Sequence, residues 1–235
     1  MLAVFIFRRN LGAELMLLRG FGLSAVPESM PVDAAGWFGL LNRHPLIGLT
    51  LLEVFDLVEY SLVGLIFLAV TVALWRINRG AVLVAVTAGW AGIITYFASN
   101  PSFALLSLSE RYAIAATETE RTYLLASGEA WLAIYNPGAV HQGAGIYVCM
   151  FLVPVAGLIM SLIMLQSRAF NKATALTGIL ANGILLGYLP ILAFAPSLLA
   201  LPFILSAPSR VTCYFLIAIK LFKLGKEKII DPDRG

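Results

Sequence analysis

Five stretches of the chain are almost continuously apolar, and this feature constrains the fold most. They cover residues 46–74, 81–98, 140–165, 173–195 and 197–222. An apolar helix of about 20 residues spans the hydrocarbon core of a bilayer, whereas strands of a membrane barrel would alternate apolar and polar residues. Because 60% of the residues are apolar and only 12% are charged, the chain cannot cover the surface of a soluble protein. The sequence predicts an all-α integral membrane protein, a bundle of five transmembrane helices.

The first 30 residues could add a sixth span. Arg8 and Arg9 interrupt the first apolar run, and more charges follow in the second. A signal peptide would carry its positive charge before an unbroken apolar run, so the pattern does not fit one. Residues 1–30 are predicted to form an interfacial helix or a degenerate first span, ahead of a single transmembrane domain over residues 31–225.

Basic residues follow the first, third and fifth apolar stretches. These residues are Arg76 and Arg79, then Arg168 and Lys172, then Lys220, Lys223, Lys226 and Lys228. If the five spans alternate in direction, all three clusters lie on the same side of the membrane, and the positive-inside rule makes that side cytoplasmic. We therefore predict a cytoplasmic tail at residues 226–235 and the connection 99–138 outside.

The outer connection carries two patterns typical of a helix start. Residues 107–110 and 117–120 both fit the capping box, in which a hydroxyl and a carboxylate accept hydrogen bonds from free amides. The patterns predict helices over residues 110–116 and 118–135. The second is predicted to be amphipathic, with aromatic residues near its end, and to form a cap on the outer membrane surface.

Several segments together resemble a known family. They are residues 33–38, 53–60, 96–101, 106–112 and 127–130. In these segments the chain is similar to a family of uncharacterised prokaryotic multi-pass membrane proteins, a domain of unknown function, over residues 31–225. The resemblance implies a multi-pass helical fold in the plasma membrane of a prokaryotic cell and assigns no catalytic residue. That family would have a further N-terminal span, and this chain departs from it with Arg8 and Arg9 where apolar residues are expected.

Three carboxylates interrupt the first apolar stretch: Glu53, Asp56 and Glu59. A carboxylate inside a span costs about 2.5–3.5 kcal/mol on insertion scales, and is a functional hypothesis by default. If residues 46–74 form one helix, the three lie in a stripe at depths of about 10, 15 and 20 Å. Arg210, about 20 Å along the fifth stretch, would then be level with Glu59, and we expect it to pair with at least one of the three carboxylates, Glu59 first among them. The cluster could be structural or hydrated, or could form a proton or cation pathway.

Two histidines and two cysteines are the other candidate ligands. His44 and His141 precede the first and third spans, and with Glu53 they could form an outer zinc, iron or proton site. No metal-binding spacing supports such a site, and interfacial histidines can simply be solvated. Cys149 and Cys213 lie in apolar stretches without a CxxC pair, which favours buried, small apolar side chains.

Small residues indicate close contacts between helices. Gly183 and Gly187 form a GxxxG pattern, and Gly157 and Ser161 form a small-xxx-small variant. Each pattern lets two helix backbones approach, either within the chain or between subunits.

No motif for a nucleophile or a phosphate loop occurs, and no basic stretch is interleaved with aromatic residues. The sequence therefore gives no positive sign of an enzyme, does not identify a cofactor, and excludes nucleic acid as a partner. Our leading hypothesis is a non-catalytic accessory or scaffold component of a membrane assembly, with the lipid bilayer and other membrane subunits as partners. The alternative is a small transporter or a proton or cation pathway that uses the intramembrane carboxylates.

Overall fold

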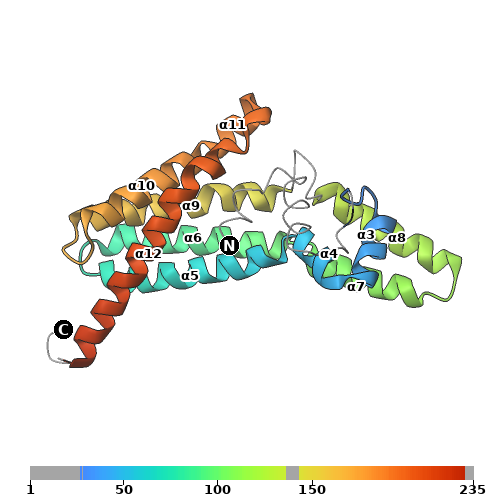
Figure 1. Ribbon diagram of the computed structural model, residues 1–235, viewed down its shortest axis with the longest axis horizontal. Helices are drawn as coiled ribbons and strands as arrows, with labels where there is room; N and C mark the ends of the chain where they lie inside the picture. Colours follow the sequence, from blue (N-terminus) through green and yellow to red (C-terminus); the bar gives the residue numbers. More distant parts are fainter. Residues whose placement is uncertain (1–26, 28, 136–142, 231–235) are drawn as a thin grey trace. The chain divides into compact units, whose positions relative to one another are not determined.

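The computed structural model describes residues 27, 29–135 and 143–230, with side chains described up to residue 223, and this part of the chain is helical without a strand (Figure 1). The helices are α3 (Ala34–Arg43), α4 (Pro45–Leu51), α5 (Val54–Leu74), α6 (Arg79–Ser99), α7 (Ser102–Ile114), α8 (Glu118–Ile134), α9 (Ala144–Gln166), α10 (Lys172–Leu186), α11 (Tyr188–Phe194) and α12 (Leu201–Ile230), with a 3₁₀ turn, η1 (Pro196–Leu198), before α12.

Five helical stretches in the described part are long and apolar enough to cross a membrane. They are Val54–Leu74, Arg79–Ile114, Ala144–Gln166, Lys172–Phe194 and Pro196–Lys223. The predicted class, an all-α membrane protein with five spans, is confirmed. The prediction for a sixth span concerns residues 1–26, which lie outside the described residues.

The predicted single domain of residues 31–225 contains two compact units. In the described part, unit 1 consists of residues 62–94 and 148–230, and unit 2 of residues 27, 29–61, 95–135 and 143–147. Each unit has its own hydrophobic core.

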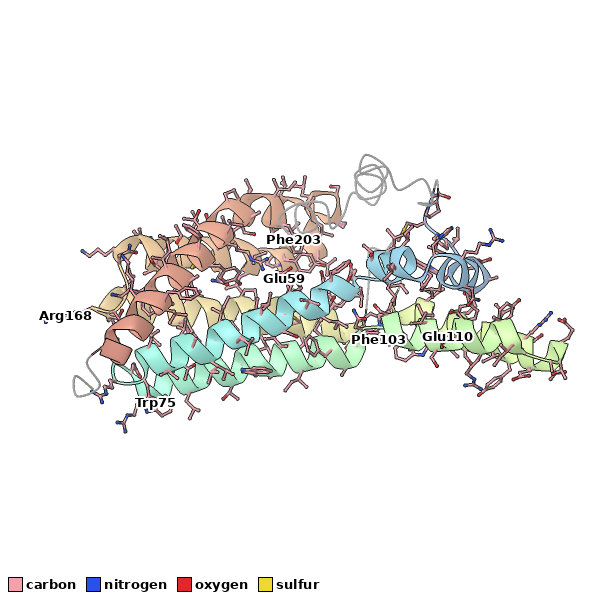
Figure 2. The ribbon with its side chains drawn as sticks, turned by 60° about the horizontal axis from the view of Figure 1, so that its bottom comes forward. Glu59, Trp75, Phe103, Glu110, Arg168 and Phe203 are labelled. Atoms are coloured by element: carbon pink, nitrogen blue, oxygen red, sulfur yellow. The ribbon has the colours of Figure 1, made fainter. Side chains whose placement is uncertain are left out.

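The core of unit 1 joins all five of its long helices. Buried side chains on α5, α6, α9, α10 and α12 form one cluster, for which Val70, Val82, Met160, Ala175 and Ile217 are representative. Large apolar side chains on the opposite faces of the same helices are exposed, as expected of helices that contact lipid. In Figure 2, Trp75 and Arg168 lie at the same end of this unit, since α5 and α9 both end there.

The core of unit 2 packs α3 and α4 against α7 and α8. Trp37 and Phe38 are fully buried in it. Two carboxylates complete the start of α3: Asp33 Oδ1 accepts from Gly36 N–H at 2.8 Å, and Glu129 Oε1 of α8 accepts from Ala34 N–H at 2.7 Å. Gly128 allows α8 to approach α3, because a Cβ there would lie 2.7 Å from the tip of the Phe38 ring.

The prediction of one continuous helix over residues 46–74 is wrong. Helix α4 ends at Leu51, and α5 begins only at Val54. Between them, Glu53 has a φ of 64°, in the left-handed region, which no α-helix of L-residues continues through. The side chains of Leu51 and Leu52 are buried in the unit 2 core, so packing holds this break in a stretch that is apolar enough for an uninterrupted span.

The predicted capping box at residues 107–110 is also wrong. Helix α7 begins five residues earlier, at Ser102, whose N–H donates to Asn100 Oδ1 at 3.0 Å. Ser107 and Glu110 therefore lie inside α7, where the backbone amides already have helical partners. Asn100 and Pro101 supply the true helix start.

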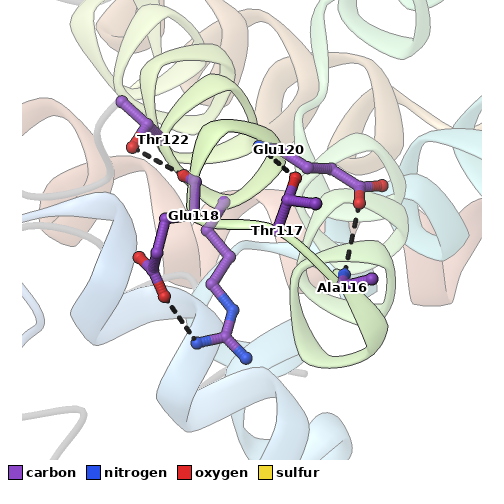
Figure 3. A network of polar contacts seen from close by, with 6 residues as sticks. Ala116, Thr117, Glu118, Glu120 and Thr122 are labelled. Carbon is purple, nitrogen blue, oxygen red and sulfur yellow. Dashed lines mark hydrogen bonds and ion pairs between the residues drawn. The ribbon is translucent and has the colours of Figure 1, made fainter.

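The second capping box is confirmed (Figure 3). Thr117 Oγ1 accepts a hydrogen bond from Glu120 N–H at 3.2 Å, and Glu120 Oε2 accepts from Ala116 N–H at 3.3 Å. Helix α8 runs from Glu118 to Ile134, and Tyr135, the predicted last residue, is its C-cap.

Candidate acidic site at the start of α5

Two carboxylates lie beside one buried tyrosine hydroxyl. Tyr96 Oη, on α6, is 3.0 Å from Asp56 Oδ2 and 3.4 Å from Glu53 Oε2. The hydroxyl carries a single proton and so can donate fully to only one carboxylate at a time. Asp56 is 4% exposed and Tyr96 is 1% exposed, so water has little access to this contact. We call these three residues the acidic site.

The backbone positions the two carboxylates differently. Glu53 precedes α5 and is the one non-glycine residue with a positive φ in the described part of the chain. Such a conformation costs about 1–2 kcal/mol for an L-residue, and strained residues of this kind cluster at functional sites. Asp56 lies in the first turn of α5, where the partial positive charge of the helix N-terminus stabilises an anion.

Two further contacts fix the acidic site in place. Ser102 Oγ, fully buried, donates to the carbonyl oxygen of Leu52 at 2.6 Å and so ties the residue before Glu53 to the start of α7. The Tyr60 ring packs on the Tyr96 ring with their centroids 4.7 Å apart. The hydroxyl and both carboxylates are therefore positioned by four different segments of unit 2.

Of the predicted stripe of three acidic residues, only Asp56 and Glu59 lie on the same helix. Because α5 begins at Val54, Glu59 lies about 8 Å along it rather than 20 Å, and Arg210 lies about 14 Å along α12. In unit 1, the Arg210 guanidinium carbon lies 5.9 Å from the centroid of the Tyr214 ring, within the range of a cation–π contact. The pairing of Arg210 with Glu59 stays a prediction.

The predicted outer histidine site is not assembled by the described residues. His44 is exposed at the N-cap of α4, and its side chain makes no capping hydrogen bond. His141 lies outside the described residues. In the part of the chain that the structure describes, no three His, Cys, Asp or Glu side chains come together in a way that could hold a metal ion.

Of the two small-residue patterns predicted to mediate helix packing, one forms a close contact between helices in the described part of the chain and the other does not. A Cβ on Gly157 would lie 2.7 Å from Asn182 Cγ, and a Cβ on Gly178 would lie 3.1 Å from Ser161 Cβ. Gly157 and Ser161 on α9 therefore form a reciprocal close contact with Gly178 and Asn182 on α10, and Gly178 and Asn182 were not expected from the sequence. No neighbour within 4 Å surrounds the position of a Cβ on Gly183 in the described part, and Gly187 is the C-cap of α10.

A small cavity of about 30 Å³ adjoins this contact, between α5, α9, α10 and α12. Its polar lining includes Ser161, Asn182 and Cys213. Ser161 Oγ donates to Gly157 O at 2.7 Å and Asn182 Nδ2 to Gly178 O at 2.8 Å, so both side chains bond their own helices. The volume is enough for one or two water molecules and too small for an organic substrate.

Sequence reasoning missed Tyr96 as a site residue. A signal for it exists, because α5 and α6 are joined by a short turn at residues 75–78 and must run antiparallel. Asp56 and Tyr96 lie about 20 residues before and after that turn, which places them side by side in an antiparallel helix pair.

No protein-family model matches this chain, and no match was found among curated proteins or solved structures. The resemblance to a family of uncharacterised multi-pass membrane proteins stays a prediction. The fold and the acidic site are therefore argued from the chain's own residues.

Proposed function

We propose that this membrane protein binds a proton or a cation at Glu53, Asp56 and Tyr96, as part of a small transport pathway. The single observation that carries the proposal is that two carboxylates share one buried hydroxyl donor. Two ionised carboxylates close together repel each other, and burial strengthens the repulsion. Binding of one proton or of one cation relieves it, so the acidic site favours an added positive charge.

Flux measurements on proteoliposomes test this proposal. The purified full chain is placed in vesicles that enclose a dye sensitive to the ion tested, either H⁺, Na⁺ or K⁺, and a membrane potential drives that ion inward. Wild-type protein should carry a flux of one of these ions above that of empty vesicles, and Asp56→Asn should lower it to the background. Glu110→Gln is the matched control, since Glu110 is an exposed acidic residue of the same unit, on α7.

Two outcomes would end the proposal. The pathway is excluded if the wild-type protein carries none of these ions. The assignment to the acidic site is excluded if Asp56→Asn, eluting from gel filtration as the wild type does, carries the wild-type flux.

A second candidate function is an accessory component of a membrane assembly. The observation that favours it is the set of large apolar side chains exposed on α7 and α8: Phe103 is 59% exposed, Ile114 82%, Tyr123 69% and Ile134 55%. Exposed apolar side chains on a folded unit are typical of a surface that contacts another molecule. Purification in a mild detergent followed by mass analysis tests this candidate, and a lone monomer without bound subunits would count against it.

We also propose that the basic ends of the helices face the cytoplasm of a prokaryotic cell, as the positive-inside rule predicts. Single cysteines at Lys223 and Thr119, both exposed, are labelled in intact cells with an impermeant thiol reagent. The native Cys149 and Cys213 are buried and are replaced by alanine in this experiment. Labelling at residue 119 alone is expected, and labelling at residue 223 would overturn the orientation.

A further inference from the structure

The charges of unit 1 are all of one sign in its described side chains. Residues 62–94 and 148–223 contain no Asp or Glu. Apart from Arg210, their basic residues lie beside helix ends or in the C-terminal half of α12, and we call this set the basic end. The basic end consists of Arg76, Arg79, Arg168, Lys172, Lys220 and Lys223.

Helix packing brings this set to one end of unit 1. Arg76 follows the end of α5, and Arg79 begins α6. Arg168 follows the end of α9, and Lys172 begins α10. Helices α5, α6, α9 and α10 share the unit 1 core, so the α5–α6 turn and the α9–α10 turn lie at the same end of it (Figure 2).

Helix α12 adds its lysines at that end. Cys213 Sγ donates to Thr174 O at 3.6 Å, which fixes the level of α12 beside the first turn of α10. Lys220 lies two helical turns beyond Cys213, about 10 Å further along α12. It is therefore level with the α9–α10 turn, which contains Arg168, and Lys223 lies one turn further on.

These charges have no partner in the described part of the chain. The side chains of the basic end are exposed, except that Lys220 is half-buried. The described ion pair of this protein, between Arg121 and Glu118, lies in unit 2. Like charges gathered at one end repel each other unless an anion lies among them.

Apolar side chains alternate with these charges and identify the kind of anion. Trp75 and Ile77 flank Arg76 and are each 38% exposed, and Phe222, beside Lys223, is 75% exposed. A dissolved anion would contact only the charges. A phospholipid contacts both groups, because its phosphate lies at the level of the helix ends while its acyl chains extend along the apolar faces.

We propose that the basic end binds the phosphate groups of anionic phospholipids. Each basic residue close to an anionic membrane surface strengthens binding about fivefold. The site selects lipids by charge, through Arg168, Lys172 and the neighbouring cations, and it is independent of the acidic site in unit 2.

Native mass spectrometry of the full chain tests the proposal. The protein is mixed with equal amounts of phosphatidylglycerol and phosphatidylcholine in detergent, and the lipids that stay bound are counted. Wild-type protein should retain phosphatidylglycerol preferentially. The double variant Arg168→Gln, Lys172→Gln should weaken phosphatidylglycerol binding about 25-fold and leave phosphatidylcholine binding unchanged.

Two controls keep the result interpretable. Arg111→Gln with Arg121→Gln removes two exposed charges from unit 2 and should leave the preference intact. The variant Arg168→Lys, Lys172→Arg keeps both positive charges and should therefore retain the preference for phosphatidylglycerol. If this variant also loses the preference, the loss comes from misfolding and not from the missing charge.

The proposal is overturned if wild-type protein retains both lipids equally or if the double variant keeps the wild-type preference. It is also overturned if millimolar inorganic phosphate displaces the lipid, since the site would then bind dissolved phosphate.

Discussion

Replacing Glu53 by glycine should stabilise the protein, because Glu53 holds a backbone conformation that glycine adopts freely. Its φ is 64°, and the left-handed region costs an L-residue about 1–2 kcal/mol. Glycine also gives the unfolded chain more conformational freedom, which lowers the free energy of unfolding by about 0.5–1 kcal/mol. The net gain from the backbone is therefore about 0.5–1 kcal/mol.

Comparison with Glu53→Ala separates the backbone contribution to stability from the contribution of the side chain. Alanine removes the carboxylate and its 3.4 Å contact with Tyr96 Oη, as glycine does, but keeps the cost of the positive φ. In one detergent, a chain of this size shifts its unfolding temperature by about 2–4 °C for each kcal/mol. Thermal unfolding should therefore place Glu53→Gly about 1–4 °C above Glu53→Ala.

The same two replacements at Ser107 provide the control. Ser107 is exposed in the middle of α7, where alanine is favoured over glycine by about 1 kcal/mol, so the order should reverse. If Glu53→Ala unfolds at the same temperature as Glu53→Gly or above it, the reasoning from the left-handed backbone is refuted.

Three further predictions concern stability in the same assay. Thr117→Ala should lower the free energy of unfolding by about 1 kcal/mol, because Thr117 Oγ1 caps α8, and an unchanged unfolding temperature would contradict the role of the cap. Gly178→Ala should destabilise the protein by about 1–3 kcal/mol, because its Cβ would lie 3.1 Å from Ser161 Cβ. Gly183→Ala, on the same helix but with no described neighbour within 4 Å, should not destabilise it. Equal effects of the two changes would exclude the close contact. Glu59→Gln should destabilise the protein and a further Arg210→Gln should recover part of the loss, whereas a double variant as unstable as the sum of both would rule out the pairing.

The number of spans could be predicted from the sequence because length and apolarity decide it. A helix needs about 20 apolar residues to cross a bilayer, and this requirement does not depend on what the helix packs against. The Thr117 cap could be predicted for a similar reason, since its hydrogen bonds join residues within one turn of each other.

The break at Glu53 could not be predicted, since neither glycine nor proline marks it. It is held by contacts between residues distant in sequence, such as the hydrogen bond from Ser102 Oγ to Leu52 O. The error at Ser107 has a related cause, because a Ser-x-x-Glu pattern caps a helix only where the amides are free. Prediction of the acidic site needs both the sequence and the packing of the helices. Its carboxylates are visible in the sequence, whereas the hydroxyl they share with Tyr96 comes from helix packing.

The reciprocal contact between α9 and α10 limits how unit 1 can change shape. Asn182 lies over Gly157 while Ser161 lies over Gly178, so neither helix can slide along the other without driving two side chains into backbone. A shift by one helical turn, about 5.4 Å, would in one direction bring Leu186 opposite Gly157 and Leu165 opposite Gly178, where neither leucine fits. The close contact therefore favours movement of α9 and α10 as one rigid hairpin, against which α5, α6 and α12 pack in the unit 1 core.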